Sequence, residues 1–300
     1  MEFEEFKKQI IEGLRDIYGD DTEIETGVAF RNNGSKYNGI SIRLKDAEYR
    51  TVPVIDLDRL YRLFENGMMK IEDCVWDIFH DSTNLSGREG VEEFAENISD
   101  WECVKDDIYP ILLSTEENQE LLKNLVTTPM LDLSVAYSIR WEHSEEGTMS
   151  VKITTKLLEY YGMSVEQLHK QAMENLEKDG YEFMELQALI KNIRQEERKE
   201  NEQKHVKPEM YVLTNSAKSY GAAGILNKKL LREFAGKRNF IILPSSVHET
   251  LFVPVTSETD KAFYDDLVSK VNEEQVRVEE KLADHSYYYD AKIGEIRMCA

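Results

Sequence analysis

The fold of this chain is decided by residues 211–255, which read YVLTNSAKSYGAAGILNKKLLREFAGKRNFIILPSSVHETLFVPV. Short runs rich in β-branched and aromatic residues, bounded by turn residues, are typical of strands. Asn227 has the side chain of a helix cap and precedes an apolar stripe, which indicates a helix between two of these runs. The segment therefore predicts strands at Met210–Thr214, Asn239–Leu243 and Val247–Val253, and a helix at Leu226–Ala235.

Three motifs in this segment carry a family resemblance. They are YVLTN at residues 211–215, YGAA at 220–223, and ILPSS at 242–246 with HE directly beyond at 248–249. With these motifs the chain resembles a family of uncharacterised proteins of similar length from Gram-positive anaerobes. The resemblance extends weakly to both ends of the chain. It implies no catalytic residues, because the family has no assigned activity.

Upstream of this segment, apolar residues recur at helical spacing in four stretches. The predicted helices run from Phe3 to Ile17, from Leu57 (capped by Asp56) to Phe64, from Met68 to Phe79, and from Val91 to Trp101. A hairpin is expected around Asn32-Asn33-Gly34, with a third strand at Thr51–Ile55. Strict alternation from Leu131 to Trp141, resumed at Met149–Ile153, predicts a long hairpin with one face in water.

Beyond Gly162 the sequence predicts a new set of helices and strands. Ser164 with Gln167 forms a capping box for a helix, and Thr259–Val271 predicts a further helix before a final strand over Tyr287–Ile296. Together these elements predict an α+β fold with antiparallel sheets, packed amphipathic helices and two subdomains. We expect an acidic domain at 1–162 that ends in the long hairpin, and a second domain at 163–300 with a charged linker near 194–207.

Charge is unevenly distributed along the chain. Of its 58 acidic and 37 basic residues, positions 51–150 hold 22 acidic and 7 basic, whereas positions 201–250 hold 4 acidic and 8 basic. An acidic surface repels nucleic acid phosphates, so binding of a nucleic acid duplex by the N-terminal half is not expected. Two explanations stay open. The charge keeps the protein dispersed, or it binds a basic protein partner in place of a nucleic acid.

Polar residues with reactive side chains gather near the segment 211–255. Ser245 or Ser246 with His248 and Asp284 are candidates for a nucleophile, a base and an orienting acid, and His285 is a further candidate base. The strand–turn–helix context of G-x-S-x-G is missing. The alternative is structural, since Ser residues after a proline commonly satisfy backbone groups in a turn.

Four further residues are candidates for binding: Asn215, Tyr220, Gly221 and Glu249. The run Tyr220–Gly224 lies between a predicted strand and a predicted helix, where phosphate-cradling turns occur. It lacks the spacing of G-x-G-x-x-G and the Lys-Ser ending of a P-loop. Small residues at such a position also allow close packing of a helix against a strand, so both interpretations stay open.

No metal site is indicated, and the sequence leaves any cofactor unknown. The six histidines are scattered without H-x-x-x-H or H-E-x-x-H spacing, and three widely spaced cysteines form neither a zinc site nor a disulfide framework. The start MEFEEFKKQI lacks the basic region of a signal peptide, and no run approaches the roughly 18 apolar residues of a membrane span. We therefore expect a cytoplasmic protein with reduced thiols that does not enter a membrane.

Two function hypotheses follow. The first is a non-enzymatic binding or interaction protein that uses an acidic face to bind a basic protein partner. An accessory protein of a mobile element or an anti-defence factor is its specific form. The second is a hydrolase-like enzyme that uses the Ser/His/Asp cluster of the C-terminal domain, and it requires those side chains to converge in a pocket.

Overall fold

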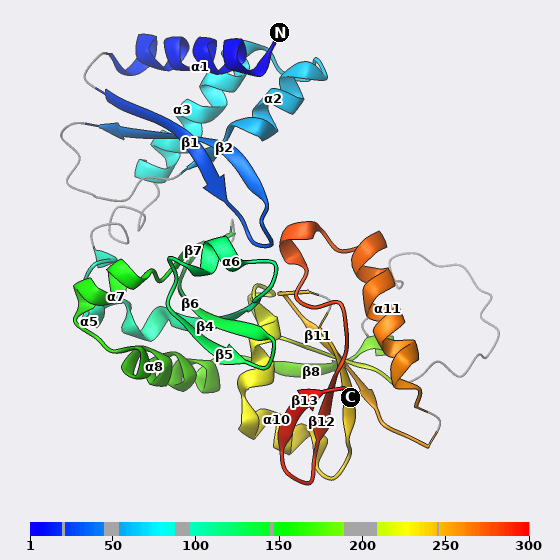
Figure 1. Cartoon of the computed structure of the whole chain (residues 1–300). Helices are drawn as coiled ribbons and strands as arrows, with labels where there is room; N and C mark the ends of the chain where they lie inside the picture. The colour runs from blue at the N-terminus through cyan, green and yellow to red at the C-terminus, as the bar shows by residue number, and fades with distance from the viewer. Residues whose placement is uncertain are drawn as a thin grey trace. The chain divides into compact units, whose positions relative to one another are not determined.

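A computed structural model describes residues 1–19, 22–44, 54–87, 97–144, 147–188, 209–244, 246–257 and 259–299 (Figure 1). The chain forms two compact units, Met1–Val104 and Lys105–Ala300. The sequence predicted a division near residue 162 instead. That the chain contains two independently folding domains, with either boundary, stays a prediction. The predicted linker near 194–207 and most of the predicted helix Val91–Trp101 lie outside the described residues.

The first unit packs three helices onto one face of a small antiparallel sheet. The helices are α1 (Phe3–Tyr18), α2 (Leu57–Glu65) and α3 (Ile71–Gly87), and the sheet has the order β1 (Thr22–Phe30), β2 (Lys36–Leu44), β3 (Ile55–Asp56). The turn Asn32-Asn33-Gly34 joins β1 to β2, with Asn33 and Gly34 at positive φ, as the sequence predicted. Asp56 caps α2 by accepting a hydrogen bond from the Arg59 amide.

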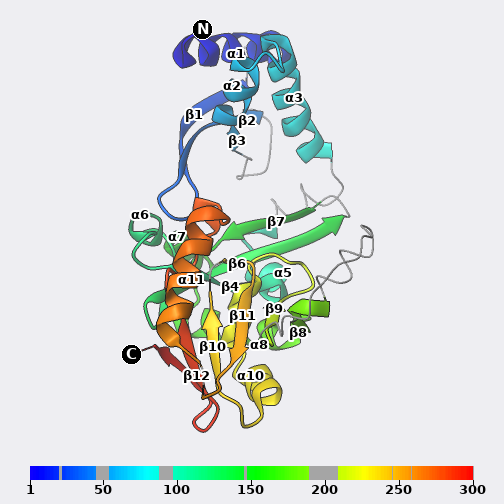
Figure 2. The same ribbon diagram turned by 90° about the vertical axis from the view of Figure 1, so that its right-hand side faces the viewer.

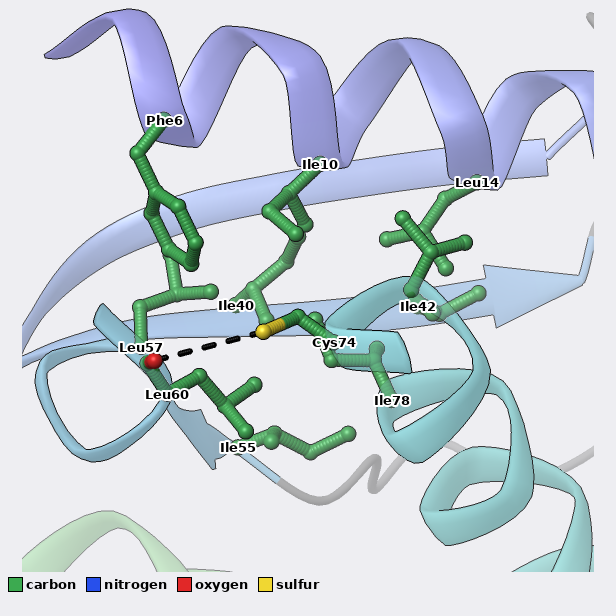
Figure 3. Packing of buried hydrophobic residues seen from close by; sticks show 11 residues of the cluster. Phe6, Ile10, Leu14, Ile40, Ile42, Ile55, Leu57, Leu60, Cys74 and Ile78 are labelled. Carbon is green, nitrogen blue, oxygen red and sulfur yellow. Dashed lines mark hydrogen bonds between the residues drawn. The ribbon is translucent and has the colours of Figure 1, made fainter. Parts of the chain in front are cut away.

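The core of this unit is built from the apolar stripes of the helices (Figure 3). Phe6, Ile10 and Leu14 of α1 point at Ile40 and Ile42 of β2, and all five side chains are buried. Cys74 lies in the same core, where its thiol contacts the Leu60 carbonyl and burial raises its pKa to about 11. A buried thiol with a raised pKa is a packing group rather than a nucleophile.

The second unit begins with a four-stranded antiparallel sheet. Its order is β4 (Ile108–Ser114), β6 (Leu133–Ser144), β5 (Thr127–Met130), and β7 (Gly147–Lys152) pairs with the second half of β6. Helix α8 (Val165–Lys178), which starts in the predicted Ser164–Gln167 capping box, covers one face. The Asn175 amide on α8 donates to the carbonyls of Lys105 and Ile108, which ties the helix to the start of β4.

The prediction of one wet face on the β6 hairpin is wrong. Residues from Leu133 to Ile139 are buried on both faces of β6. One face packs beneath α8, where Tyr137 hydrogen-bonds to His169. The opposite face, which carries the small residue Ala136, packs against Tyr220 from another part of the unit. Small and hydroxyl side chains on that face allow a close approach, and alternation alone does not distinguish this from exposure to water.

A six-stranded antiparallel sheet contains the segment 211–255. Its order is β13 (Glu295–Met298), β12 (Tyr287–Asp290), β10 (Phe240–Leu243), β11 (Thr250–Pro254), β9 (Tyr211–Thr214), β8 (Glu182–Glu185). Helix α10 (Lys228–Ala235) and helix α11 (Lys261–Glu274) lie on different sides of β10 and β11 (Figure 2). Phe240 packs against Phe234 of α10, whereas Ile241 packs with Val268 of α11, so β10 is buried on both faces.

Two strand predictions in this sheet need correction. The predicted final strand over Tyr287–Ile296 is a hairpin of β12 and β13, because Gly294 turns the chain at a φ of +70°. The predicted strand from Val247 is shorter and starts at Thr250. The backbone groups of Val247 form hydrogen bonds outside the sheet. Its amide donates to the Glu280 carbonyl, and its carbonyl accepts from the Ala222 amide.

The remaining helices are short. They are α5 (Trp101–Val104), η1 (Lys105–Asp107), α6 (Gln119–Leu122), α7 (Thr155–Tyr161), η2 (Gly221–Leu226) and η3 (Val278–Glu280). Gly162 ends α7 in the left-handed conformation that favours glycine. Helix η2 places the YGAA motif between the two sheets of the second unit, against β4 and β9.

Candidate functional site

The motifs YVLTN, YGAA and HE meet around His248. The Tyr220 amide donates to His248 Nδ1 at 3.2 Å, and the two rings lie 5.8 Å apart between centroids. An Nδ1 that accepts a backbone N–H carries no proton, so the neutral tautomer has its proton on Nε2. That Nε2 lies 3.4 Å from Glu280 Oε1 of η3. Both ring nitrogens therefore face partners within the protein.

Glu280 is the acidic partner in this cluster. Its second neighbour is the Arg277 guanidinium, which hydrogen-bonds to the Glu280 carboxylate. This bond and the charge of Arg277 hold the pKa of Glu280 below its usual value, against the opposing effect of burial. Sequence reasoning missed Glu280 because it lies 32 residues beyond His248 in a charged run, EEKLADH, that carries no motif.

Ser246 acts on the backbone. Its Oγ accepts a hydrogen bond from the His248 amide at 3.0 Å, and the residue forms an isolated bridge with Lys281. This is the turn geometry expected of a serine that satisfies main-chain groups. Ser245, the other candidate nucleophile, lies outside the described residues.

Asp284 and His285 have surroundings of their own. Asp284 accepts a hydrogen bond from the Asn272 amide of α11 at 2.6 Å. His285 Nε2 lies 3.2 Å from Asp132 Oδ2, although the geometry is not that of a hydrogen bond. In the described structure no hydrogen bond or ion pair joins either residue to His248. Among the described residues, Ser246 is thus joined to His248 only through the His248 backbone amide, and no hydrogen bond or ion pair joins His248 to Asp284.

Asp132 is a second residue that sequence reasoning missed. It follows Leu131, a leucine at a φ of +56°, in the tight turn between β5 and β6. The Tyr287 hydroxyl of β12 donates to Asp132 Oδ1 at 2.7 Å, and burial together with this carboxylate raises the pKa of Tyr287. Asp132 thereby connects the two sheets of the unit, a contact over 155 positions that no local pattern indicates.

Asn215 and Tyr220 lie at the two ends of one loop. The Asn215 side chain donates to the Ser219 carbonyl and accepts from the Ser219 amide, so it closes residues 215–219 into a turn. Lys218 and Tyr220 both adopt a φ of +50° within or beside that turn. Glu249, the remaining binding candidate, is exposed. Asn215 of the YVLTN motif therefore fixes the conformation of this loop, because its side chain forms the hydrogen bonds that a backbone group would otherwise form.

Gly221 and Gly224 occur where the backbone approaches its neighbours closely. A Cβ on Gly221 would lie 2.5 Å from Thr214 Oγ1 and would also overlap the His248 carbonyl oxygen. A Cβ on Gly224 would lie 2.6 Å from Cδ1 of Tyr181. Among the two interpretations of this run, these contacts support close packing.

Replacement of Gly221 by alanine is expected to lower the free energy of unfolding by about 1–3 kcal/mol, since overpacking displaces the backbone of residue 248. Urea denaturation measures the change. Gly27→Ala is the matched control because a Cβ there meets nothing within 4 Å. An equal effect of the two substitutions would contradict the close-packing explanation.

Among the described residues, no group of three or more His, Cys, Asp or Glu side chains is arranged to hold a metal ion. None of the described helices combines the length and the apolar character needed to cross a bilayer.

The fold and the contacts around His248 define an antiparallel α+β protein in which the motif residues form a hydrogen-bonded loop cluster. The chain belongs to a family of unknown function, DUF5688, whose model matches residues 3–291. This match confirms the resemblance to a family without an assigned activity, while its Gram-positive origin and the individual motifs stay predictions. No curated protein matches the chain, and no solved structure does.

Proposed function

We propose that this protein is a non-enzymatic binding protein, and that the unit Met1–Val104 contacts a basic protein partner. That unit holds 24 acidic and 12 basic residues, a balance of −12 in a chain whose total is −21. It contributes more than half of the net charge from about a third of the length. A surface of this kind speeds the approach of a positively charged partner and makes the complex sensitive to salt.

The observation that carries the proposal is the exposed face of α3. Trp76 is 53% exposed there, and Glu72, Asp73, His80 and Asp81 are exposed on the same helix. The indole packs edge-on against Phe79 at 5.3 Å, so its position is defined before any partner binds. Tryptophan is prominent among the residues that dominate binding energy at protein interfaces. An aromatic anchor within an acidic rim suits a basic protein surface.

Basic side chains of the unit are drawn into ion pairs with part of its acids. Arg59 lies 2.7 Å from Asp77, Arg31 lies 2.8 Å from Asp56, and Lys7 lies 2.7 Å from Glu4. The surplus charge is therefore carboxylate on the surface, available to a partner. Paired surface charges of this type contribute little stability, which leaves association as the property that the surplus affects most.

The test is affinity capture with the full-length protein from its native host, followed by titration of the recovered partner. We expect the affinity to fall between about 50 and 500 mM salt because surface charges are screened. Trp76→Ala is expected to cost about 2 kcal/mol of binding, roughly 30-fold in Kd. Tyr160→Ala, at an exposed aromatic residue of the second unit, is the matched control. A complex indifferent to salt and to Trp76→Ala would exclude this surface.

Two finer hypotheses stay predictions. One is that the partner is a nucleic-acid-binding protein whose cleft the acidic surface occupies, as in an anti-defence factor or a mobile-element accessory protein. The other is the hydrolase-like activity of the Ser/His/Asp cluster. The binding proposal is favoured because Ser246 and His248 already hold backbone groups, and the hydrolase needs the same atoms for chemistry.

A further inference from the structure

A small cavity lies between the two sheets of the second unit, beside the loop 215–220. It encloses about 30 Å³, which is room for roughly two or three waters. One wall comes from β4, β6 and β7, and the other from Tyr181, Asn215, Ser219 and Tyr220. Two of the binding candidates that the sequence singled out, Asn215 and Tyr220, thus line the same enclosed space.

The chemistry of the lining is selective. No carboxylate lines the cavity, in a chain that carries 58 of them. The polar side chains around it are the hydroxyls of three serines and three tyrosines, the Asn215 amide and the Arg140 guanidinium. Each of these groups can donate a hydrogen bond. A cavity whose every polar side chain can donate suits a ligand that accepts hydrogen bonds.

Arg140 supplies the positive charge and is held in place. Its two terminal nitrogens donate to the Asp179 carboxylate at 3.1 and 3.0 Å, and its guanidinium lies 3.7 Å from the centroid of the Tyr109 ring. Asp179 itself does not line the cavity. The carboxylate fixes the plane of the guanidinium from outside, as an orienting partner does for a metal ligand.

Two buried tyrosine hydroxyls in the lining can act as hydrogen-bond donors. Burial raises the pKa of Tyr109 and of Tyr181, so both hydroxyls stay protonated at neutral pH. A second cation lies close by, since Lys152 Nζ is 5.8 Å from the centroid of the Tyr220 ring. Lys152 and Arg140 therefore bring two positive charges to this region, next to the carboxylates of Asp179 and Asp107, which both act on the Tyr109 hydroxyl.

We propose that this cavity binds a small oxyanion, a phosphate ion or the terminal phosphate of a small ligand. Its oxygens would accept from the hydroxyls of Ser150, Ser219 and the three tyrosines, with the positive charges of Arg140 and Lys152 nearby. The Ser138 hydroxyl already donates to the Val151 carbonyl. Charge-assisted hydrogen bonds of this kind are about twice as strong as neutral ones. This site is independent of the acidic surface of the first unit.

Isothermal titration of the full-length protein with inorganic phosphate, at constant ionic strength in chloride, tests the proposal. We expect saturable binding that weakens about tenfold in Tyr181→Phe, which removes a donor to a charged ligand, and in Lys152→Gln, which removes a nearby positive charge. Lys123→Gln, at a surface lysine paired with Glu120, is the matched control and should bind like the wild type. Glycerol phosphate in a second titration distinguishes a free anion from a phosphate monoester.

Two results would overturn the proposal. One is the absence of saturable binding by both phosphate and glycerol phosphate. The other is binding that Tyr181→Phe and Lys152→Gln leave unchanged, which would place the anion elsewhere on the surface. Should Tyr181→Phe fail to fold, as judged by circular dichroism, Ser219→Ala takes its place because Ser219 lines the same cavity.

Discussion

Replacement of Arg140 by alanine is expected to lower the free energy of unfolding of the second unit by about 3–5 kcal/mol. The side chains of Arg140 and Asp179 are only 13% and 6% exposed, so the substitution leaves a nearly buried carboxylate without its partner. It also removes the contact between the guanidinium and the Tyr109 ring. Urea denaturation followed by circular dichroism measures the loss.

The double variant Arg140→Met with Asp179→Asn separates the two causes. It removes both charges and keeps much of the packing, and buried ion pairs replaced by uncharged groups of similar size often cost little. We expect the double variant to be more stable than Arg140→Ala. The single variants Arg140→Met and Asp179→Asn complete the comparison. If the double variant loses as much free energy of unfolding as the two single variants lose together, the pair is not coupled and the ion-pair explanation is wrong.

Phe6→Ala is expected to destabilise the first unit by about 3–5 kcal/mol, the usual range for a buried phenylalanine. Phe6 is fully buried among the core side chains (Figure 3). Its ring lies 5.2 Å from Tyr61 and 5.4 Å from Phe64 between centroids. Hydrogen exchange measured by mass spectrometry should show lost protection at residues 1–104 and retained protection at 105–300, because each unit has its own core.

Phe30→Ala is the control for this experiment. Phe30 belongs to the same unit but is 48% exposed at the end of β1, so its truncation should change protection little. Equal loss of protection in both units after Phe6→Ala would show that the two units unfold together. It would contradict the expectation that each unit is stabilised by its own core.

Local patterns predicted the elements whose signals are local. The apolar stripe of α1, the Asp56 and Asn227 caps, and the Ser164–Gln167 capping box are all confirmed. Each depends on residues three or four positions apart, which interact in any context. Strands β4 and β5 were missed. Pro110 and Pro129 interrupt the expected strand composition, and both strands are held by pairing with β6.

The candidate site divides in the same way. The sequence placed Tyr220, His248 and Asn215 together because the motifs are dense there, and the structure joins Tyr220 to His248 directly. It did not indicate Glu280 or Asp132, the acids that face the two histidines. These acids come from distant positions in runs without a motif, and the register of sheets and turns decides where they meet.

The α+β class, the antiparallel strands of the segment 211–255, the helix caps and the acidic character of the first 150 residues could all be predicted from the sequence. These properties follow from spacing and composition. Three features became visible only in the folded chain. The YGAA run packs against Thr214 and residue 248, β6 is buried on both faces, and Arg140 pairs with Asp179 beside a cavity that no carboxylate lines. The reason is that such contacts join residues far apart in the chain, where neither periodicity nor capping carries information.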